Sequence, residues 1–465
     1  MLTRIEIDGF KSFRDFHLDL PPFLVIIGRN AAGKSNLFDA IQFIGQLAGQ
    51  PVLEAAQQSR GDITDLFHRH VDGTPMKVMT FAVEVLLDGS VTDAFGDSVR
   101  VNHSRLRYEL VIELREVGHT GALRPFVIHE SAFKIRRVDD RWIQQFDPAD
   151  RKALAVYSNG AADLLDTEVD DQGRPRFSIR QQGNQGRKRH LPATAATASV
   201  LSTLTTATDF PLLYALKREL QSWRLLYLDP SALRRPDSFD DPDTLAANGA
   251  HLANTLRRIA EESGDADRPA GVLNDLSADV ATIVPGIVQV QVSDDAVRRQ
   301  RQVEVVTQDE APYSARVASD GTLRTIALLA ALYDPAGAGL ICFEEPENGL
   351  FPGRLAQFVS SLRELVKRGI QARGAGRGEK LTQLVLSSHS PAILRALDPS
   401  GDGTRRDAIY MDVATLVGGG RGRSRISKYR DLTGPQLSVD TELQPGAVVS
   451  PSEIAEFEVS EALER

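Results

Sequence analysis

The fold is decided by residues 23–35, which read Phe23-Leu24-Val25-Ile26-Ile27-Gly28-Arg29-Asn30-Ala31-Ala32-Gly33-Lys34-Ser35. The apolar run at the start is typical of a strand that is buried on both faces. The remainder matches the pattern G-x-x-x-x-G-K-[ST], in which backbone N–H groups curl around phosphates, the lysine reaches the outer phosphates and the serine hydroxyl binds magnesium. Apolar residues at helical spacing follow as far as Leu47, so a helix directs its positive end at the anion. A glycine turn could match by chance, but the flanking strand and helix favour a nucleotide site.

Adjacent carboxylates follow another apolar strand. Residues 340–343 are apolar, and Glu344, Glu345, Pro346 and Glu347 come directly after them. The carboxyl end of a buried strand is where a parallel sheet opens toward its ligand. In a P-loop enzyme this position supplies a magnesium ligand and a base for the attacking water. We therefore assign Glu344 to magnesium and Glu345 to the water. Taken alone, the run would be a solvated acidic loop, but the P-loop in the same chain favours the catalytic interpretation.

Two further features lie before and after these carboxylates in the sequence. The apolar helical stretch 323–332 is preceded by Ser319, Asp320, Gly321 and Thr322. These residues either cap the helix only, or also hold a γ-phosphate with the free N–H groups of the helix start. His389 follows the apolar strand 384–387. A neutral imidazole at that point could hydrogen-bond the γ-phosphate or the attacking water.

In this order, the four features resemble the ABC-class ATPase heads of the SMC and RecF group, and most closely the stand-alone AAA-type ATPases related to the OLD nucleases. The resemblance covers most of the chain. It includes the opening segment 5–13, with Phe10-Lys11-Ser12-Phe13, and the middle segment 248–253. It implies an α/β fold, a P-loop NTPase of ABC/SMC-head type with a mixed sheet core, an antiparallel β subdomain and a helical insertion.

The same resemblance implies an activity and a site. The chain would hydrolyse ATP to ADP and phosphate with magnesium, working as a head-to-tail homodimer with two ATP molecules at the interface. The nucleotide-binding residues it implies are Gly28, Asn30, Gly33, Lys34, Ser35 and Asn36. Glu345 and His389 would be catalytic, and Ser35 and Glu344 would hold magnesium. The signature residues, which would reach the ATP of the other subunit in trans, are Ser319, Asp320, Gly321 and Thr322.

Differences between this sequence and the signature of transporter ATPases exclude one class of function. Ala318, Asp320 and Thr322 stand where transporter ATPases carry Leu, Gly and Gln, which argues against a transporter subunit. The settings that the resemblance implies are DNA repair and antiviral defence. The alternative is a nucleotide-gated scaffold with slow hydrolysis, which controls a partner effector or nuclease.

The elements divide the chain into four expected parts. The N-terminal half of the ATPase head, with Walker A and antiparallel strands, is expected at 1–170. The C-terminal half, with signature, Walker B and histidine, is expected at 301–430. Between them, 171–300 would form a polar loop and a helical insertion, and 431–465 would be a polar tail. Residues 172–208 are rich in Gly, Gln, Thr and Ala and contain no acidic residue, which predicts a loop or a loosely ordered insertion.

The composition of the chain bears on whether it contacts nucleic acid or a membrane and on whether it contains disulfides. The chain has 465 residues, a net charge of -9 and a single cysteine, which argues against a basic coat for wrapping nucleic acid and against an intrachain disulfide framework. No apolar run approaches the roughly 18 residues of a membrane span, and the start lacks a signal-peptide pattern. We therefore expect a cytoplasmic protein without membrane contact. Arg187, Lys188 and Arg189 could neutralise DNA phosphates, with a solvated loop as the alternative.

Overall fold

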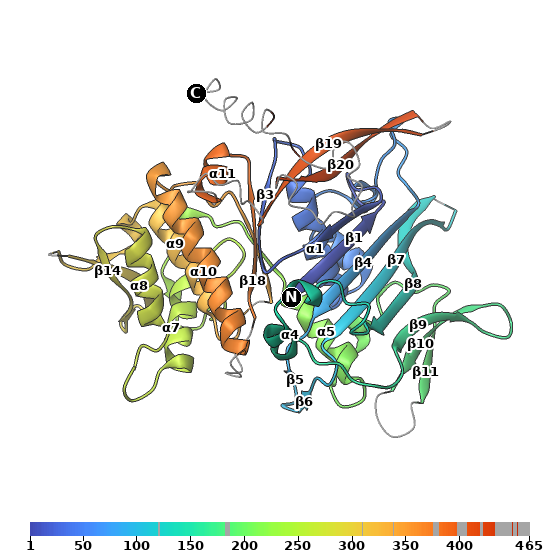
Figure 1. Ribbon diagram of the computed structural model, residues 1–465, viewed down its shortest axis with the longest axis horizontal. Coiled ribbons are helices and arrows are strands. Elements are labelled where there is room, and N and C mark those ends of the chain that lie inside the picture. Colours follow the sequence, from blue (N-terminus) through green and yellow to red (C-terminus); the bar gives the residue numbers. More distant parts are fainter. Residues whose placement is uncertain are drawn as a thin grey trace.

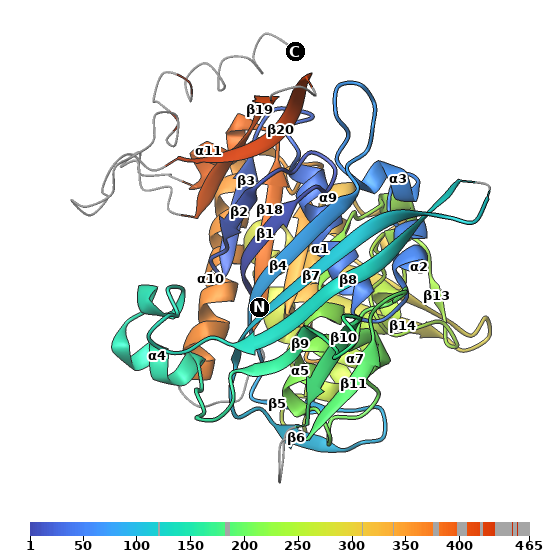
Figure 2. The ribbon, with the colours of Figure 1, turned by 90° about the vertical axis from the view of Figure 1, so that its right-hand side faces the viewer.

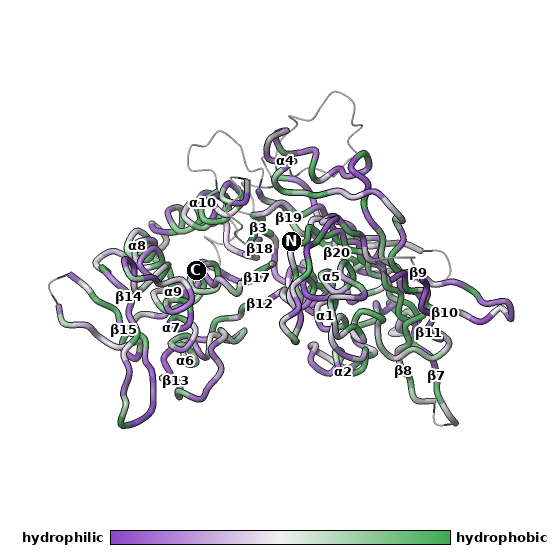
Figure 3. The backbone as a smooth tube through the Cα atoms, turned by 90° about the horizontal axis from the view of Figure 1, so that it is seen from below, coloured by the Kyte–Doolittle hydropathy of each residue, from purple (hydrophilic) through white to green (hydrophobic). Residues whose placement is uncertain are grey.

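The computed structural model describes residues 1–119, 121–181, 187–308, 310–337, 339–374, 381–397, 407–418 and 422–432, together with 449 and 453. A central sheet separates an antiparallel sheet from a lobe of helices (Figure 1). Seen from below, the helices of one lobe and the strands of the other again lie on opposite sides of the central strands (Figure 3). The α/β fold of ABC/SMC-head type, predicted from the sequence, is confirmed.

The central sheet has the strand order β12-β17-β18-β3-β19-β20. The first five of these strands are parallel, and β20 pairs with β19 in the antiparallel sense. Their bounds are β12 (Arg224–Leu226), β17 (Leu340–Glu344), β18 (Gln383–Ser388), β3 (Phe23–Ile27), β19 (Ala408–Gly418) and β20 (Gly422–Asp431). Successive side chains of a strand point to opposite faces of the sheet, so β3 contributes to two hydrophobic cores. Leu24 and Ile26 pack on the side of the antiparallel sheet, and Val25 packs into the helical lobe.

The antiparallel sheet forms the face seen in Figure 2 and has the order β11-β10-β9-β8-β7-β4-β1-β2. Its strands are β1 (Leu2–Asp8), β2 (Phe16–Asp19), β4 (Val78–Leu86), β7 (Arg105–Val117), β8 (Ala122–Lys134), β9 (Asp163–Val169), β10 (Pro175–Arg180) and β11 (Lys188–Pro192). The helices in this part of the chain are α1 (Lys34–Leu47), α2 (Val52–Gln57), α3 (Ile63–Leu66), α4 (Pro148–Leu154) and α5 (Pro211–Gln221), and a small hairpin joins β5 (Ser90–Thr92) to β6 (Ser98–Arg100).

The loop predicted at 172–208 is wrong in its first half. Residues 175–180 and 188–192 are the paired strands β10 and β11 at the edge of the antiparallel sheet. The side chains of Phe177 and Ile179 are buried in the core of that lobe. Apolar residues therefore alternate along β10 as a half-buried strand requires, although glycines and glutamines surround them in the sequence.

The helical lobe carries most of the remaining elements. They are α6 (Pro230–Leu233), α7 (Leu252–Ser263), α8 (Leu273–Ile283), α9 (Asp320–Tyr333), α10 (Leu355–Gly374), α11 (Pro391–Leu397), β13 (Asp237–Ser238), β14 (Ile287–Asp295), β15 (Gln300–Thr307) and β16 (Tyr313–Ser314). None of the helices in the described part of the chain is long and apolar enough to cross a membrane. The tail predicted at 431–465 lies outside the described residues, except for positions 431, 432, 449 and 453.

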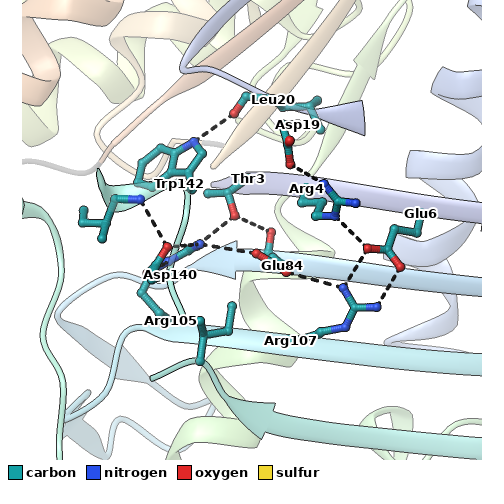
Figure 4. A network of polar contacts seen from close by, with 12 residues as sticks. Thr3, Arg4, Glu6, Asp19, Leu20, Glu84, Arg105, Arg107, Asp140 and Trp142 are labelled. Carbon is teal, nitrogen blue, oxygen red and sulfur yellow. Dashed lines mark hydrogen bonds and ion pairs between the residues drawn. The ribbon is translucent and has the colours of Figure 1, made fainter. Parts of the chain in front are cut away.

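A buried polar network fastens the start of the antiparallel sheet (Figure 4). Arg105 is fully buried and donates to both oxygens of Asp140, at 2.6 and 3.1 Å, and to Thr3 Oγ1 at 2.8 Å. The side chain of Gln383, at the start of β18, bonds both the N–H and the C=O of Leu2. These two hydrogen bonds join the two sheets at β1. Removing one member of the buried Arg105–Asp140 ion pair would lower the free energy of unfolding by roughly 3–5 kcal/mol.

Candidate nucleotide site

The phosphate loop follows β3 and is closed from behind by the C-terminal strands. Gly33 has a φ of 104°, in the left-handed region that favours glycine, and α1 begins directly after it. A Cβ atom at Gly33 would overlap Ser427 Oγ of β20, and one at Gly28 would overlap the carbonyl oxygen of Met411 of β19. Packing alone therefore requires glycine at both positions.

Lys34 lies within the loop that it would serve. Its Nζ donates to the carbonyl oxygens of Gly28 at 2.6 Å and Arg29 at 3.0 Å. Burial lowers the pKa of Lys34, while the charges of Glu345 and Glu344 raise it. The ammonium and these carboxylates therefore share one site. A cavity of about 320 Å³ is lined by residues 30–36, Glu344, Glu345 and Ser387.

The two carboxylates differ in their surroundings. Glu344 ends β17, and its Oε1 is buried without a hydrogen-bond partner in the described part of the chain. Glu345 lies beyond the strand with a φ of 52°, and its backbone N–H donates to the carbonyl oxygen of Ser387 at 2.8 Å. This turn brings Glu345 Oε1 to 3.2 Å from His389 Nδ1, while Asn348 Nδ2 donates to Glu345 Oε2 at 2.5 Å.

The oxygens present suit a hard divalent cation. Glu344 and Ser35 line the same cavity, and carboxylate and hydroxyl oxygens are ligands of the kind that magnesium prefers. An unpartnered buried carboxylate oxygen is costly unless a cation or donor compensates it. Ser35 and Glu344 are therefore the residues that could hold magnesium. Glu347 is mostly buried, which raises the pKa of its carboxyl, and it accepts a hydrogen bond from Ser388.

The signature residues cap α9 and stand apart from this cavity. Ser319 Oγ accepts from the backbone N–H of Thr322 at 3.2 Å and lies 2.8 Å from Thr322 Oγ1. Asp320 is paired with Arg234. Gly321 packs so closely on the carbonyl oxygen of Gly349 that a Cβ atom would overlap it. Among the described residues that line the cavity, none belongs to the signature.

The basic residues proposed for nucleic acid are partly neutralised. Lys188 is paired with Glu168 of β9, and this ion pair lowers the pKa of the Glu168 carboxyl. Arg176 of β10 lies 3.6 Å from the same carboxylate. The side chains of Arg187 and Arg189 remain exposed beside them. The hairpin therefore carries less free positive charge than its sequence indicates.

Sequence reasoning missed Arg60 and the serines behind the loop. Burial lowers the pKa of Arg60, but its hydrogen bond and ion pair with Asp39 of α1 raise it, and the charge of Glu344 adds to the rise. Arg60 is thus an additional cation beside the carboxylates, in a segment that matches no motif considered. Ser12 Oγ accepts from Asn36 Nδ2 and from Ser427 Oγ, each at 2.8 Å. Only Ser12 lay in a recognised sequence segment.

Comparison with known proteins identifies the family. The family model described as "AAA domain, putative AbiEii toxin, Type IV TA system" matches residues 23–395. The chain belongs to this AAA-domain family. The family and the site residues agree with an ATPase of the SMC-head and AAA type.

Curated relatives and solved structures show similar proteins. The chain is 29% identical over 181 residues to structural maintenance of chromosomes protein 1 of Arabidopsis thaliana, covering 35% of this chain and 14% of that protein. It is 50% identical over 44 residues to the chromosome partition protein Smc of Methanocaldococcus jannaschii, covering 9% and 4% of the two chains. The chain thus spans a small part of these relatives. A crystal structure of the SmcHead bound to the C-winged helix domain of ScpA matches with a TM-score of 0.48 and 13% identity, covering 92% of this chain and 97% of that one.

Proposed function

We propose that the AAA-type protein binds ATP with magnesium and hydrolyses it to ADP and phosphate. The observation that carries this proposal is the position of Glu345. Its carboxylate lies between His389 and Asn348 and lines the same cavity as Lys34 and Ser35. Such a carboxylate can take the proton of an attacking water in front of phosphates held on the loop.

Each side chain has a role in this reaction. The loop N–H groups and Lys34 would hold the β- and γ-phosphates. Ser35 and Glu344 would hold magnesium, which when bound would supply positive charge to the phosphate oxygens. Glu345 accepts a proton from the water as the water oxygen bonds to the γ-phosphorus. The bond from that phosphorus to the bridging oxygen breaks, and the electron pair leaves with ADP. His389 orients Glu345, because its Nδ1 lies 3.2 Å from an oxygen of that carboxylate.

We also propose that the active unit is a head-to-tail homodimer. The signature residues lie away from the cavity of their own chain, which supports a role toward the ATP of the other subunit. Large apolar side chains are exposed in the neighbouring segments: Val317 is 74% exposed just before the signature, and Phe351 is 76% exposed just after Gly349 and Leu350. The contact of Gly321 with Gly349 brings these segments together. Exposed apolar groups in one region favour a protein interface.

Complementation between two inactive variants tests this arrangement. Glu345→Gln and Ser319→Arg should each be inactive alone. Subunits mixed before ATP is added would form heterodimers, in which one site carries both changes and the other carries neither. ATP turnover should then recover to roughly a quarter of the wild-type value, from random pairing of subunits. A mixture no more active than the sum of its components would exclude composite sites.

We infer a setting in antiviral defence rather than DNA repair. The family description names a toxin–antitoxin system, which supports the first setting. The pairing of Lys188 with Glu168 weakens the case for a DNA-binding hairpin. Strong stimulation of ATP turnover by duplex DNA, lost in a variant with Arg187, Lys188 and Arg189 all changed to alanine, would instead favour repair.

A further inference from the structure

We propose that a second ligand site, for a small phosphorylated anion, lies at the amino end of the parallel sheet. A cavity of about 440 Å³ opens there, between the end of α5, the start of β12 and the segment that precedes β17. Its polar lining includes Ser90, Thr92, Arg218, Ser222 and Arg224. This site is independent of the proposed ATPase activity.

The cavity lies at the amino ends of the parallel strands, whereas the nucleotide site lies at their carboxyl ends. Arg224 begins β12 and pairs with Ile341, near the start of β17, whereas Glu344 ends that strand. Gly339, which also lines the cavity, precedes Glu344 by about 16 Å of extended chain. A ligand here would therefore not touch the phosphate loop, and the two sites can be separated by mutation.

Arg224 supplies the main charge. The residue is half-buried, and its guanidinium makes neither an ion pair nor a hydrogen bond with the described part of the chain. Burial lowers the pKa of Arg224, while Asp334 raises it. Asp334 also binds Arg258 at 2.8 Å, so Arg224 shares the charge of this carboxylate with a second guanidinium. An arginine stays charged even when desolvated, so Arg224 brings to this cavity a positive charge that no described carboxylate contacts directly.

The carboxylates that line the cavity are already paired. Glu219 accepts from the amino group of Met1 at 2.6 Å and from the indole N–H of Trp223 at 3.0 Å. Asp88 is bound by Arg373 at 3.0 Å. In contrast, Arg218 is exposed at the rim of the cavity and has no side-chain partner among the described residues. Two arginines without a directly bound carboxylate thus line a cavity in which both described carboxylates are paired.

These features fit a phosphoryl group better than a neutral ligand. The planar guanidinium donates paired hydrogen bonds that match the spacing of phosphate oxygens. The volume of about 440 Å³ lies within the range of roughly 300–1,000 Å³ that is usual for small-molecule sites. It leaves room for an organic portion beside the phosphoryl group.

Phosphate and pyrophosphate titrations of the full chain test the proposal. The titrations use the Lys34→Ala background, which weakens anion binding on the P-loop, at constant ionic strength. Trp223 is adjacent to Arg224 and only 7% exposed, so its fluorescence reports on the cavity, and calorimetry supplies an independent affinity. We expect saturable binding in Lys34→Ala, weakened at least about tenfold by adding Arg224→Gln.

Three further variants make the result decisive. Arg224→Lys keeps the positive charge but loses the paired N–H donors of the planar guanidinium, and should bind with intermediate affinity. Arg218→Gln changes an exposed side chain at the rim, so it should weaken binding without affecting the fold. Arg298→Gln removes an exposed arginine of the β14–β15 turn and should change nothing. Absence of saturable binding in Lys34→Ala, or equal affinity in the Arg224→Gln, Arg218→Gln and Arg298→Gln variants, would overturn the proposal.

Discussion

Replacing Glu345 by glutamine should separate ATP binding from ATP hydrolysis. Glutamine has the same shape, so its oxygen can still accept the hydrogen bond that Asn348 donates at 2.5 Å. The phosphate loop is unchanged, and binding of ATP should be at least as tight, since one negative charge near the γ-phosphate is removed. The amide cannot accept the proton of the attacking water. Hydrolysis should therefore lose its general base while the site remains assembled.

The size of the loss follows from the arrangement of the pair. A positioned general base contributes roughly 100- to 10,000-fold, or about 3–5 kcal/mol of barrier. His389 acts on this base through a single contact of 3.2 Å. Loss of one hydrogen bond of this kind costs about 1–1.5 kcal/mol, so His389→Ala should slow hydrolysis roughly tenfold. Glu345→Gln should therefore be the more damaging of the two changes by at least about tenfold.

Single-turnover release of phosphate measures the hydrolytic step, and a fluorescent ATP analogue measures binding in the same preparations. Glu261→Gln is the matched control, because it makes the same chemical change on an exposed part of α7 and should leave both measurements unaltered. If Glu345→Gln hydrolyses ATP within threefold of the wild-type rate, or if His389→Ala loses more activity than Glu345→Gln, the assignment of the base is wrong.

Other predictions concern the frame around the site. In Gly321→Ala the new Cβ would overlap the carbonyl oxygen of Gly349, so ATP turnover should fall while ATP binding to the monomer persists. Burial raises the pKa of Glu130 from 4.5 to about 7. The folded protein therefore holds this proton between those pH values while the unfolded chain releases it, and the free energy of unfolding should fall by about 3 kcal/mol as pH rises through that window. Arg105→Met leaves Asp140 charged and buried, and should lower the free energy of unfolding by about 3–5 kcal/mol.

Each of these predictions has a control or a decisive outcome. Gly369→Ala has open space around the new methyl group and lies in α10, so it should stabilise the fold by up to about 1 kcal/mol. A Glu130→Gln variant whose melting temperature follows the wild-type pH dependence would show that another group titrates. Adding Asp140→Leu to Arg105→Met should restore part of the lost stability, since the unpaired charge is removed. A double variant as unstable as Arg105→Met would contradict the explanation.

The sequence predicted the parts of the site that one short segment specifies. Gly33, Lys34, Glu344, Glu345 and His389 each follow or start a regular element whose apolar pattern was visible, and parallel strands bring their carboxyl ends to one edge. The order of the strands in the sheet therefore brings motifs that are separate in the sequence to one cavity.

Contacts between distant segments could not be predicted in the same way. Ser427 lies behind the phosphate loop only because β20 joins the sheet through β19, and no local pattern indicates that pairing. Arg60 approaches the carboxylates through its ion pair with Asp39, which depends on how residues 58–62 pack on α1. The β10–β11 hairpin was missed because its two strands are short and mostly polar, and the residues around them are rich in glycine and glutamine. Only Phe177 and Ile179 alternate as apolar residues in β10, and the pairing with β9 cannot be read from so short a pattern.

The position of β3 has a consequence for biosynthesis. This strand emerges early from the ribosome, yet its neighbours on both sides, β18 and β19, are made near the end of the chain. Leu2 and Gln383, which join the two sheets, are 381 positions apart, a separation that takes about 20 to 75 s to translate. During that time β3 has no neighbouring strand on either side, and its apolar side chains must be shielded from water by the nascent antiparallel sheet or by a chaperone. A polypeptide released before residue 422 would lack β20, which closes the loop from behind, so abortive translation products should be unable to compete for nucleotide.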